Sequence, residues 1–231
     1  MTKKLQCGHF SFALEGPEST QPIVMGILNI TPDSFSDGGR YQGLEFALTH
    51  AETMIKDGAT MIDIGGESTR PGSPGVPLDE ELRRVMPTLY ALRTLDVALS
   101  VDTCKPEVMR EALIAGADMI NDINGFRAPG AIAAVQDSDC GLCVMHMQAT
   151  PETMQQAPQY DDVVGEVIAF LRERVDAMTA AGIERERICV DPGFGFGKTV
   201  EHNYALLQGL QRMRDELGLP VLAGMSRKSM I

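Results

Sequence analysis

Acidic and amide side chains stand at the ends of several short apolar runs, and this placement is the strongest chemical signal in the sequence. Asp102, Asn121 and Asp191 each close such a run, in Val-Asp-Thr, Ile-Asn-Asp-Ile and Val-Asp-Pro-Gly. A buried carboxylate costs free energy unless a partner meets it. Three such groups together suit a flat heterocycle rich in N–H donors. The alternative is a structural network with backbone amides and Lys228.

A second signal is the polar segment from Asn29 to Gly39, which contains Asp33 and Asp37. The segment is too polar and too rich in glycine to continue a strand. Mg²⁺ prefers oxygen ligands and usually takes only one or two from protein, while phosphate and water supply the rest. The segment therefore predicts either a metal–phosphate site or a surface turn stabilised by Asx and Ser side chains.

The segment from Asp63 to Gly72 also follows an apolar run, and it combines glycines, hydroxyls and Arg70. Glycine permits close backbone approach, and arginine supplies a permanent bidentate cation. These residues predict a mobile loop that grips an anion. The alternative is a surface ion pair between Glu67 and Arg70.

Two further motifs could be taken for a nucleotide-binding loop and a metal ligand, but their residues favour neither function. The run up to Lys198-Thr199 resembles a nucleotide-binding P-loop, but Pro192 stands where the first glycine of that motif belongs, so we exclude an NTPase. His146 follows an apolar run and has no second His or Cys at ligand spacing, which favours a structural role or a substrate contact over a metal ligand.

The elements that must position these residues follow a strand–helix–strand period. Seven short runs are almost continuously apolar, as in parallel strands covered on both faces: 23–29, 61–65, 99–103, 119–123, 141–147, 188–191 and 220–226. Amphipathic stripes between them predict helices. Gly58, Gly116, Gly182 and Gly218 stand where helices end, and Pro106 suits a first helical turn.

Polar residues at the ends of all seven runs favour a (β/α)8 TIM barrel, an α/β fold with its site at the carboxyl ends of the strands. A doubly wound sheet would use mainly the loops near its switch point. We expect a single domain over residues 1–231, with 1–22 as an N-terminal hairpin or cap and 23–231 as the barrel. Because only seven strands are found, we expect the last helix–strand–helix to be missing; a complete seven-stranded barrel is the alternative.

Composition narrows the class of protein. The chain has 231 residues and a formal net charge of −12 without a Lys/Arg cluster, which argues against nucleic-acid and anionic membrane partners. No apolar run reaches the length of a membrane span, and no secretory signal begins the sequence. The five cysteines cannot all pair. Most lie in or beside apolar runs, so we expect buried, reduced thiols in the cytoplasm.

Read together, the motifs resemble those of the bacterial dihydropteroate synthase family. They are Gly26–Gly39, Asp63–Gly72, Ser100–Thr103, Ile120–Ile123, Val144–Met147, Asp191–Lys198 and Gly224–Ser229. The resemblance implies a transferase of folate biosynthesis, the target of sulfonamides. It would condense 6-hydroxymethyl-7,8-dihydropterin diphosphate with 4-aminobenzoate and release pyrophosphate.

Carried over position by position, the resemblance implies a role for each matching residue. Asn29 would hold Mg²⁺. Catalytic roles would fall to Asp33, Asp37, Arg70 and Lys228. The contacts to the pterin and its diphosphate would be Thr69, Asp102, Asn121, Met145, Asp191, Phe196 and Lys228. The aminobenzoate pocket would be lined by Phe35, Arg70, Pro71, Lys228 and Ser229.

Chemistry agrees with this assignment, because an aryl amine needs no dedicated base and charge placement around the departing diphosphate would dominate catalysis. The family's last strand supplies an Arg and a His to the diphosphate pocket, and its last helices form most of a homodimer interface. Without them we expect little activity and a poorly stable monomer. Two rivals are a methyltetrahydrofolate-dependent methyltransferase, which has no diphosphate to grip, and an inactive pterin-binding fragment.

Overall fold

The structure is a computed structural model. It describes residues 2–17, 19, 22–30, 39–68, 75–148, 154, 158–226 and 228, and for residues 39–42 it describes only the backbone.

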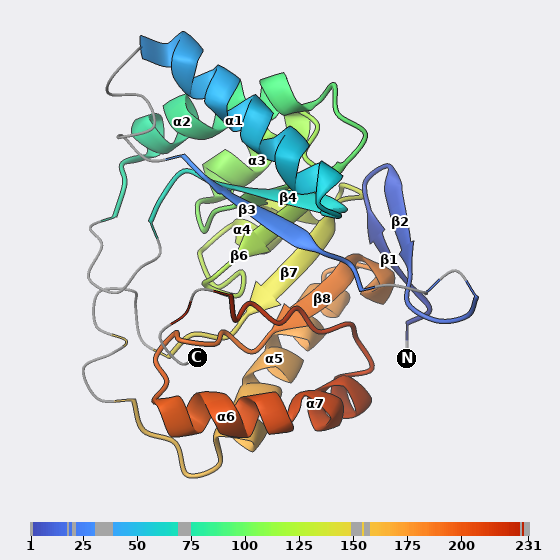
Figure 1. The fold of residues 1–231 in the computed structure, drawn as a ribbon. Coiled ribbons are helices and arrows are strands. Elements are labelled where there is room, and N and C mark those ends of the chain that lie inside the picture. Colours follow the sequence, from blue (N-terminus) through green and yellow to red (C-terminus); the bar gives the residue numbers. More distant parts are fainter. Residues whose placement is uncertain are drawn as a thin grey trace.

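A parallel sheet of six strands forms the centre of the molecule, and its strands are hydrogen-bonded in the order of the sequence (Figure 1). The strands are β3 (Met25–Asn29), β4 (Met61–Gly65), β5 (Ala98–Asp102), β6 (Met119–Asp122), β7 (Gly141–Met145) and β8 (Ile188–Asp191). One helix lies between each pair of successive strands: α1 (Gly39–Lys56), α2 (Leu78–Leu92), α3 (Pro106–Ile114), α4 (Ala131–Val135) and α5 (Val163–Ala180). Two more, α6 (Val200–Gln208) and α7 (Leu210–Leu217), follow β8. This arrangement confirms the predicted α/β barrel class, with the sheet left open between β3 and the chain after β8.

Both faces of the strands are apolar, which explains their continuous hydrophobicity in the sequence. The outward side chains, among them Ile62, Val101 and Val144, pack with the helices in the main core. The inward side chains near the amino ends of the strands, such as Met61 and Met119, form a second cluster. Among the described strands, β4 and β5 carry inward polar residues from their middle, at Asp63 and Ser100, and Asp102 and Asn121 follow at the carboxyl ends.

An N-terminal hairpin packs against the amino end of the barrel. It consists of β1 (Lys4–Cys7) and β2 (Phe10–Ala13), which pair antiparallel. Leu5 and Cys7 are buried in the inner cluster. The carboxylate of Asp118 accepts from the backbone N–H of Leu99 at 3.0 Å and lies 3.4 Å from Nδ1 of His9, so it joins the hairpin turn to the sheet.

The seventh predicted strand, residues 220–226, does not form a regular strand. It makes a single parallel bridge, between Val190 and Val221. Backbone bonds from Val190 N–H to the Pro220 carbonyl and from Leu222 N–H to the Val190 carbonyl hold it against β8. Pro220 has no N–H, and within the described residues the segment pairs on one side only, so the ladder does not extend.

Local signals for the helix ends are confirmed. Gly58, Gly116, Gly182 and Gly218 all have a positive φ, between 63° and 107°. Pro106 stands in the first turn of α3, and three acidic residues stand in the first turn of α2, where they complement the helix dipole. At these positions the helices begin or end where the sequence predicts.

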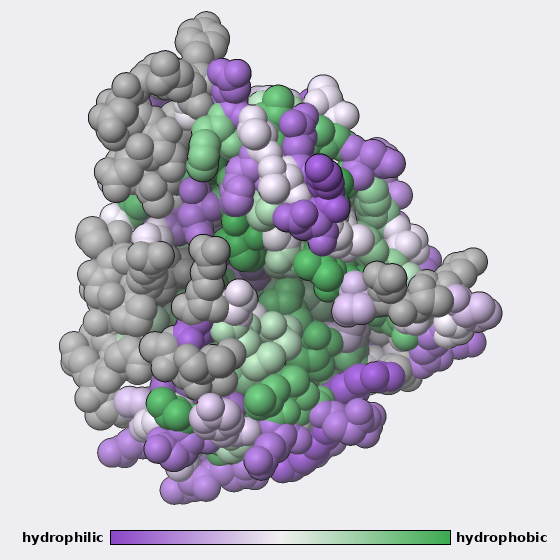
Figure 2. All heavy atoms as spheres, viewed as in Figure 1, coloured by the Kyte–Doolittle hydropathy of each residue, from purple (hydrophilic) through white to green (hydrophobic). Residues whose placement is uncertain are grey.

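The open side of the sheet exposes apolar side chains. Figure 2 shows them gathered in the middle of the viewed face, below α1 and above α6 and α7. Val24, next to β3, and Ile27 within it are 45% and 52% exposed. Among the described residues, β3 has a strand neighbour on one edge only.

Candidate active site

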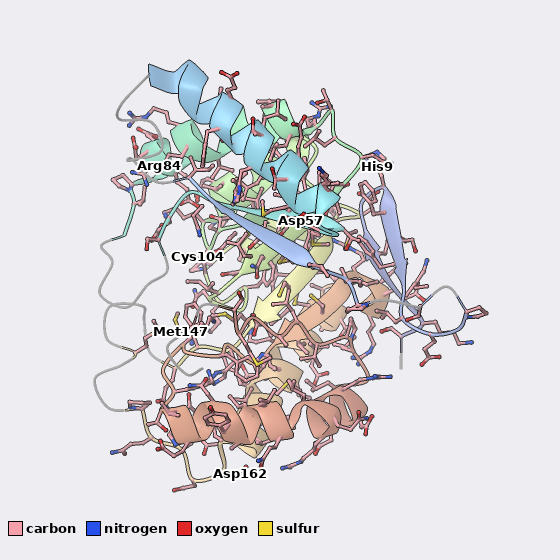
Figure 3. All side chains as sticks on the ribbon, viewed as in Figure 1. His9, Asp57, Arg84, Cys104, Met147 and Asp162 are labelled. Carbon is pink, nitrogen blue, oxygen red and sulfur yellow. The ribbon has the colours of Figure 1, made fainter. Side chains whose placement is uncertain are left out.

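Strand register brings the predicted polar residues to one end of the barrel. Asn29 pairs with Gly65, Gly65 with Asp102, and Asp102 with Asn121, so these positions form one inward row. Met145 and Asp191 are likewise paired on β7 and β8. In Figure 3, Cys104 and Met147, which follow β5 and β7, lie at the opposite end of the sheet from His9 in the hairpin turn.

Gly65 lets two oxygen atoms converge at this end. A Cβ atom placed on Gly65 would lie 3.0 Å from Oδ1 of Asn29 and 3.9 Å from Oδ2 of Asp102. Any larger residue would push into the Asn29 amide. The side chain of Asn29 is exposed, so its oxygen is accessible at the mouth of the barrel.

Asp63 lies one row of inward residues further into the barrel than Asn121, and a hydrogen bond connects the two side chains. Nδ2 of Asn121 donates to Oδ2 of Asp63 at 3.0 Å, across the intervening strand β5. Asp63 is only 3% exposed. Burial raises the pKa of Asp63, and the hydrogen bond from Asn121 partly opposes that rise.

Asp102 lies in the most acidic surroundings of the described site. Burial raises the pKa of its carboxyl well above the usual value, and the nearby carboxylates of Asp63, Asp122, Glu81 and Glu67 raise it further. Such crowding favours a proton, a cation or a set of N–H donors at this place. The mouth therefore suits an electron-poor or donor-rich ligand.

Lys228, Asp191 and Phe196 meet on the opposite side of the mouth. Nζ of Lys228 lies 4.5 Å from the ring centroid of Phe196, and it donates to the backbone carbonyl of Phe194. The Asp191 carboxylate accepts from the Gly193 N–H at 2.7 Å. Burial raises the pKa of Asp191, while the Gly193 N–H and the positive charges of Lys228 and Lys198 oppose this.

Lys198 and His146 form a buried pair; the sequence left His146 open between a structural role and a substrate contact, and it did not assign Lys198 to the site. Nζ of Lys198 lies 3.0 Å from Nδ1 of His146 and donates to the carbonyls of Gly193 and Phe196, each at 2.9 Å. Burial lowers the pKa of His146 to about 3, with Lys198 adding to the effect, and burial lowers the pKa of Lys198 to about 7. These contacts give His146 a structural role.

The loop that joins Lys198 to Asp191 requires glycine at position 193. Gly193 has a φ of +69°, and a Cβ there would lie only 1.9 Å from the carbonyl oxygen of His146. The ends of β7 and β8 therefore approach closely, and Lys198 ties them together. The glycine-rich pattern before Lys198 was the available sequence signal, although it was weighed only as a phosphate loop.

A second missed residue is Lys105, at the start of α3. Its Nζ lies 2.5 Å from Oε2 of Glu67 and 2.5 Å from Oε2 of Glu81. Glu81 is buried and belongs to α2, whereas Glu67 follows β4. Glu67 is thus paired with Lys105, so the predicted surface pairing of Glu67 with Arg70 is not needed to explain its position.

Several predicted site residues lie outside the described part of the chain. They are Asp33, Phe35, Asp37, Thr69, Arg70, Pro71 and Ser229. Asn29, Asp102, Asn121, Met145, Asp191, Phe196 and Lys228 are described, and the structure places them around one mouth.

The donor chemistry at the mouth fits a magnesium ion. The Asn29 amide oxygen is a hard ligand, it is exposed, and Asp102 lies on the other side of Gly65. No cluster of three His, Cys, Asp or Glu residues suited to a metal occurs among the described residues. A metal here would accordingly depend on substrate phosphate and water for most of its ligands.

The cysteines are free thiols. Cys7, Cys140, Cys143 and Cys189 are buried, and Cys104 is partly buried. Burial raises the pKa of Cys104 to about 12, so its thiol is protonated and unreactive at neutral pH. The prediction of reduced, buried cysteines agrees with this arrangement.

Comparison with family models and known sequences assigns the chain to a family. The model described as "Pterin binding enzyme" matches residues 25–231. The Escherichia coli (strain K12) dihydropteroate synthase is 52% identical over 213 residues, which are 92% of this chain and 75% of that protein. The Neisseria meningitidis serogroup C enzyme of the same name is 47% identical and covers 98% of this chain and 79% of its own. The chain thus spans about three quarters of these relatives.

Solved structures agree in fold and in family. Burkholderia cenocepacia dihydropteroate synthase, complexed with 7,8-dihydropteroate, has a TM-score of 0.86 and 56% identity, and the match covers 98% of this chain and 78% of that one. Xanthomonas albilineans dihydropteroate synthase with 4-aminobenzoic acid has a TM-score of 0.88 and 49% identity, and the match covers 100% of this chain and 80% of that one.

No helix in the described part of this chain is both long and apolar enough to cross a bilayer.

Proposed function

The chain belongs to the pterin-binding enzyme family, where its relatives are dihydropteroate synthases, and we propose that it condenses 6-hydroxymethyl-7,8-dihydropterin diphosphate with 4-aminobenzoate. The products are 7,8-dihydropteroate and pyrophosphate, and the chain is a transferase. The observation that most supports this reaction is the convergence of Asp102, Asn121 and Asp191 with Lys228 at one mouth. Oxygen acceptors there match the N–H donors of a pterin.

The reaction breaks a C–O bond and forms a C–N bond at the methylene carbon of the pterin. The departing pyrophosphate takes the electron pair of the C–O bond, and the aryl amine donates its lone pair to the same carbon and then loses a proton. Positive charge develops on the pterin as the diphosphate leaves. The carboxylates of Asp102 and Asp191 stabilise that charge, and preorganised contacts of this kind are typically worth about 10²–10³ in rate each.

Lys228 would contact the pterin from the opposite side of the mouth. Its Nζ lies over Phe196, and burial lowers the pKa of Lys228 while Asp191 opposes the effect. In this proposal Lys228 donates to the pterin, and Met145 and Phe196 pack beside the ring. Asp33, Phe35, Asp37, Thr69, Arg70, Pro71 and Ser229 keep the roles that the resemblance implies.

Mg²⁺ belongs to the same proposal. Asn29 would hold it at the mouth, where it would neutralise the diphosphate as the C–O bond breaks. The exposed amide oxygen of Asn29 supports this role.

A coupled assay of pyrophosphate release tests the proposed reaction. The expected result is release that requires the pterin diphosphate, 4-aminobenzoate and Mg²⁺ together, with dihydropteroate formed in equal amount. Metal-independent binding of methyltetrahydrofolate in calorimetry would instead support a methyltransferase. Tight binding of the pterin diphosphate without pyrophosphate release would support an inactive pterin-binding fragment.

The family resemblance also carries two coarser proposals. We propose a cytoplasmic location. The described residues contain no helix that could span a bilayer. We also propose a homodimer, which light scattering after gel filtration tests.

A further inference from the structure

The hydrogen bond between Asp63 and Asn121 has a direction, and that direction decides what the barrel mouth offers to a ligand. Asp63 pairs in register with Ser100, and Asn121 pairs with Asp102, two residues further along β5. Asp63 therefore lies one row deeper than Asn121. The bond of 3.0 Å runs from the mouth into the barrel.

A primary amide can be turned either way, because its oxygen and nitrogen ends have nearly the same shape. An ionised carboxylate only accepts hydrogen bonds. Asp63 therefore requires the NH₂ group of Asn121 to point inwards. The amide oxygen, Oδ1 of Asn121, is then left at the mouth.

That oxygen is buried and has no hydrogen-bond partner within the described residues. A buried acceptor without a partner costs about 1–3 kcal/mol, so it marks a place where a ligand or water completes the site. Asp102 is the register neighbour of Asn121 and is a further acceptor. The mouth thus presents adjacent oxygen acceptors and no amide donor at this position.

We propose that Asp63 is a positioning residue that fixes the amide of Asn121 with its oxygen towards the mouth, and that this orientation selects a heterocycle with an N–H donor there. The proposal rests on the proposed function for the identity of the heterocycle, a pterin. Asp63 itself acts through Asn121. If the amide were turned, its NH₂ group would face the N–H groups of the ligand.

An exchange of the two residues tests the proposal. In Asp63→Asn the amide of Asn121 has no fixed direction, so we expect the KM for the pterin diphosphate to rise about tenfold. The KM for 4-aminobenzoate should stay within about twofold. The double variant Asp63→Asn/Asn121→Asp keeps the same atoms and charge, and its new carboxylate always presents an oxygen to the mouth. We therefore expect the pterin KM to return to within about threefold of the wild type.

A merely structural hydrogen bond predicts a different pattern, in which both KM values rise and kcat falls, or the double variant is no better than Asp63→Asn. Either result overturns the proposal, as does an unchanged pterin KM in Asp63→Asn. Circular dichroism and thermal melting establish that each variant is folded.

A second measurement is made on the wild-type chain and does not depend on turnover; a variant is needed only to assign the signals. With ¹⁵N-labelled asparagine, the NH₂ signals of Asn121 are identified by their loss in Asn121→Asp. We expect slow exchange of these protons with solvent, both with and without the pterin diphosphate. Fast exchange in the free protein overturns the proposal. Absence of pyrophosphate release by the wild type would reject the proposed function and leave this reading of the amide intact.

Discussion

Nζ of Lys198 lies 3.0 Å from Nδ1 of His146, and both side chains are buried beneath the loop that follows Asp191. When Lys198 is protonated it has no acceptor, so Nδ1 of His146 then accepts and the ring proton resides on Nε2. Burial and the lysine charge lower the pKa of His146 to about 3. The pair therefore keeps a neutral imidazole in the wall of the site.

Acid is expected to weaken the fold through His146. Its pKa in the native state lies below the ordinary value of 6.5, so the unfolded state takes up the proton first. The stabilisation is complete above about pH 6.5 and is lost as the pH falls towards 3. From about pH 6 to about pH 4, the free energy of unfolding should fall by about 1 kcal/mol per pH unit more in the wild type than in His146→Asn. Urea unfolding measures both, and parallel pH profiles would refute the prediction.

Lys198→Met should loosen the loop after β8. The carbonyls of Gly193 and Phe196 lose a buried donor, which is expected to cost about 2–3 kcal/mol of unfolding free energy. Because this loop follows Asp191, the KM for the pterin diphosphate should rise more than the KM for 4-aminobenzoate. The exposed Lys56→Met is a matched control that should change neither quantity. Equal effects on the two KM values would contradict a local role.

Lys105→Met should be strongly destabilising, because it leaves two carboxylates without their shared cation. Glu81 is 1% exposed, so its desolvation is not recovered from water. We expect a loss of about 2–4 kcal/mol in chemical denaturation. Adding Glu81→Gln to Lys105→Met should restore part of that loss, since the buried charge is then gone. If the two substitutions simply add, the ion pair is not the cause.

The strands and helix ends could be predicted because their signals are local. Runs such as Gly141–Met145 are apolar on both faces, and glycines such as Gly182 adopt the left-handed conformation at a helix end. The row of polar residues at the mouth followed from the parallel arrangement alone. These features need no knowledge of which distant residues meet.

The partners of buried polar groups could not be predicted in the same way. Asp63 and Asn121 are 58 residues apart, and Lys198 and His146 are 52 apart. Their pairing depends on register and side-chain direction across the barrel. Lys105 likewise gave no signal, since a lysine before a helix is ordinarily solvated, yet it neutralises two acids from different elements. The strand expected at 220–226 reduced to one bridge because apolarity alone does not supply a pairing edge.

Asp102→Asn should lower kcat/KM by about 10²–10³, because we propose that this carboxylate stabilises positive charge developing on the pterin. The same change at Asp96, which is exposed, is the matched control and should leave the rate unchanged. Since burial and neighbouring acids raise the pKa of Asp102, its removal also relieves repulsion, and the variant is expected to unfold at an equal or higher urea concentration. A rate loss that accompanies unfolding would argue for a structural role instead.

The main expected effect of Asn29→Ala is a higher magnesium requirement for activity. The amide oxygen of Asn29 lies at the mouth beside Gly65, where it is exposed and close to Asp102. If Asn29 holds Mg²⁺ as proposed, its loss leaves the diphosphate and water to bind the ion, so the Mg²⁺ concentration for half-maximal activity should rise about 10–100-fold. The rate at saturating Mg²⁺ should recover most of the wild-type value, because the reacting atoms are untouched. Isothermal titration with the pterin diphosphate provides the control: the substitution should weaken binding with Mg²⁺ present and leave binding in excess EDTA unchanged. Weaker binding in EDTA as well would mean that Asn29 contacts the substrate directly.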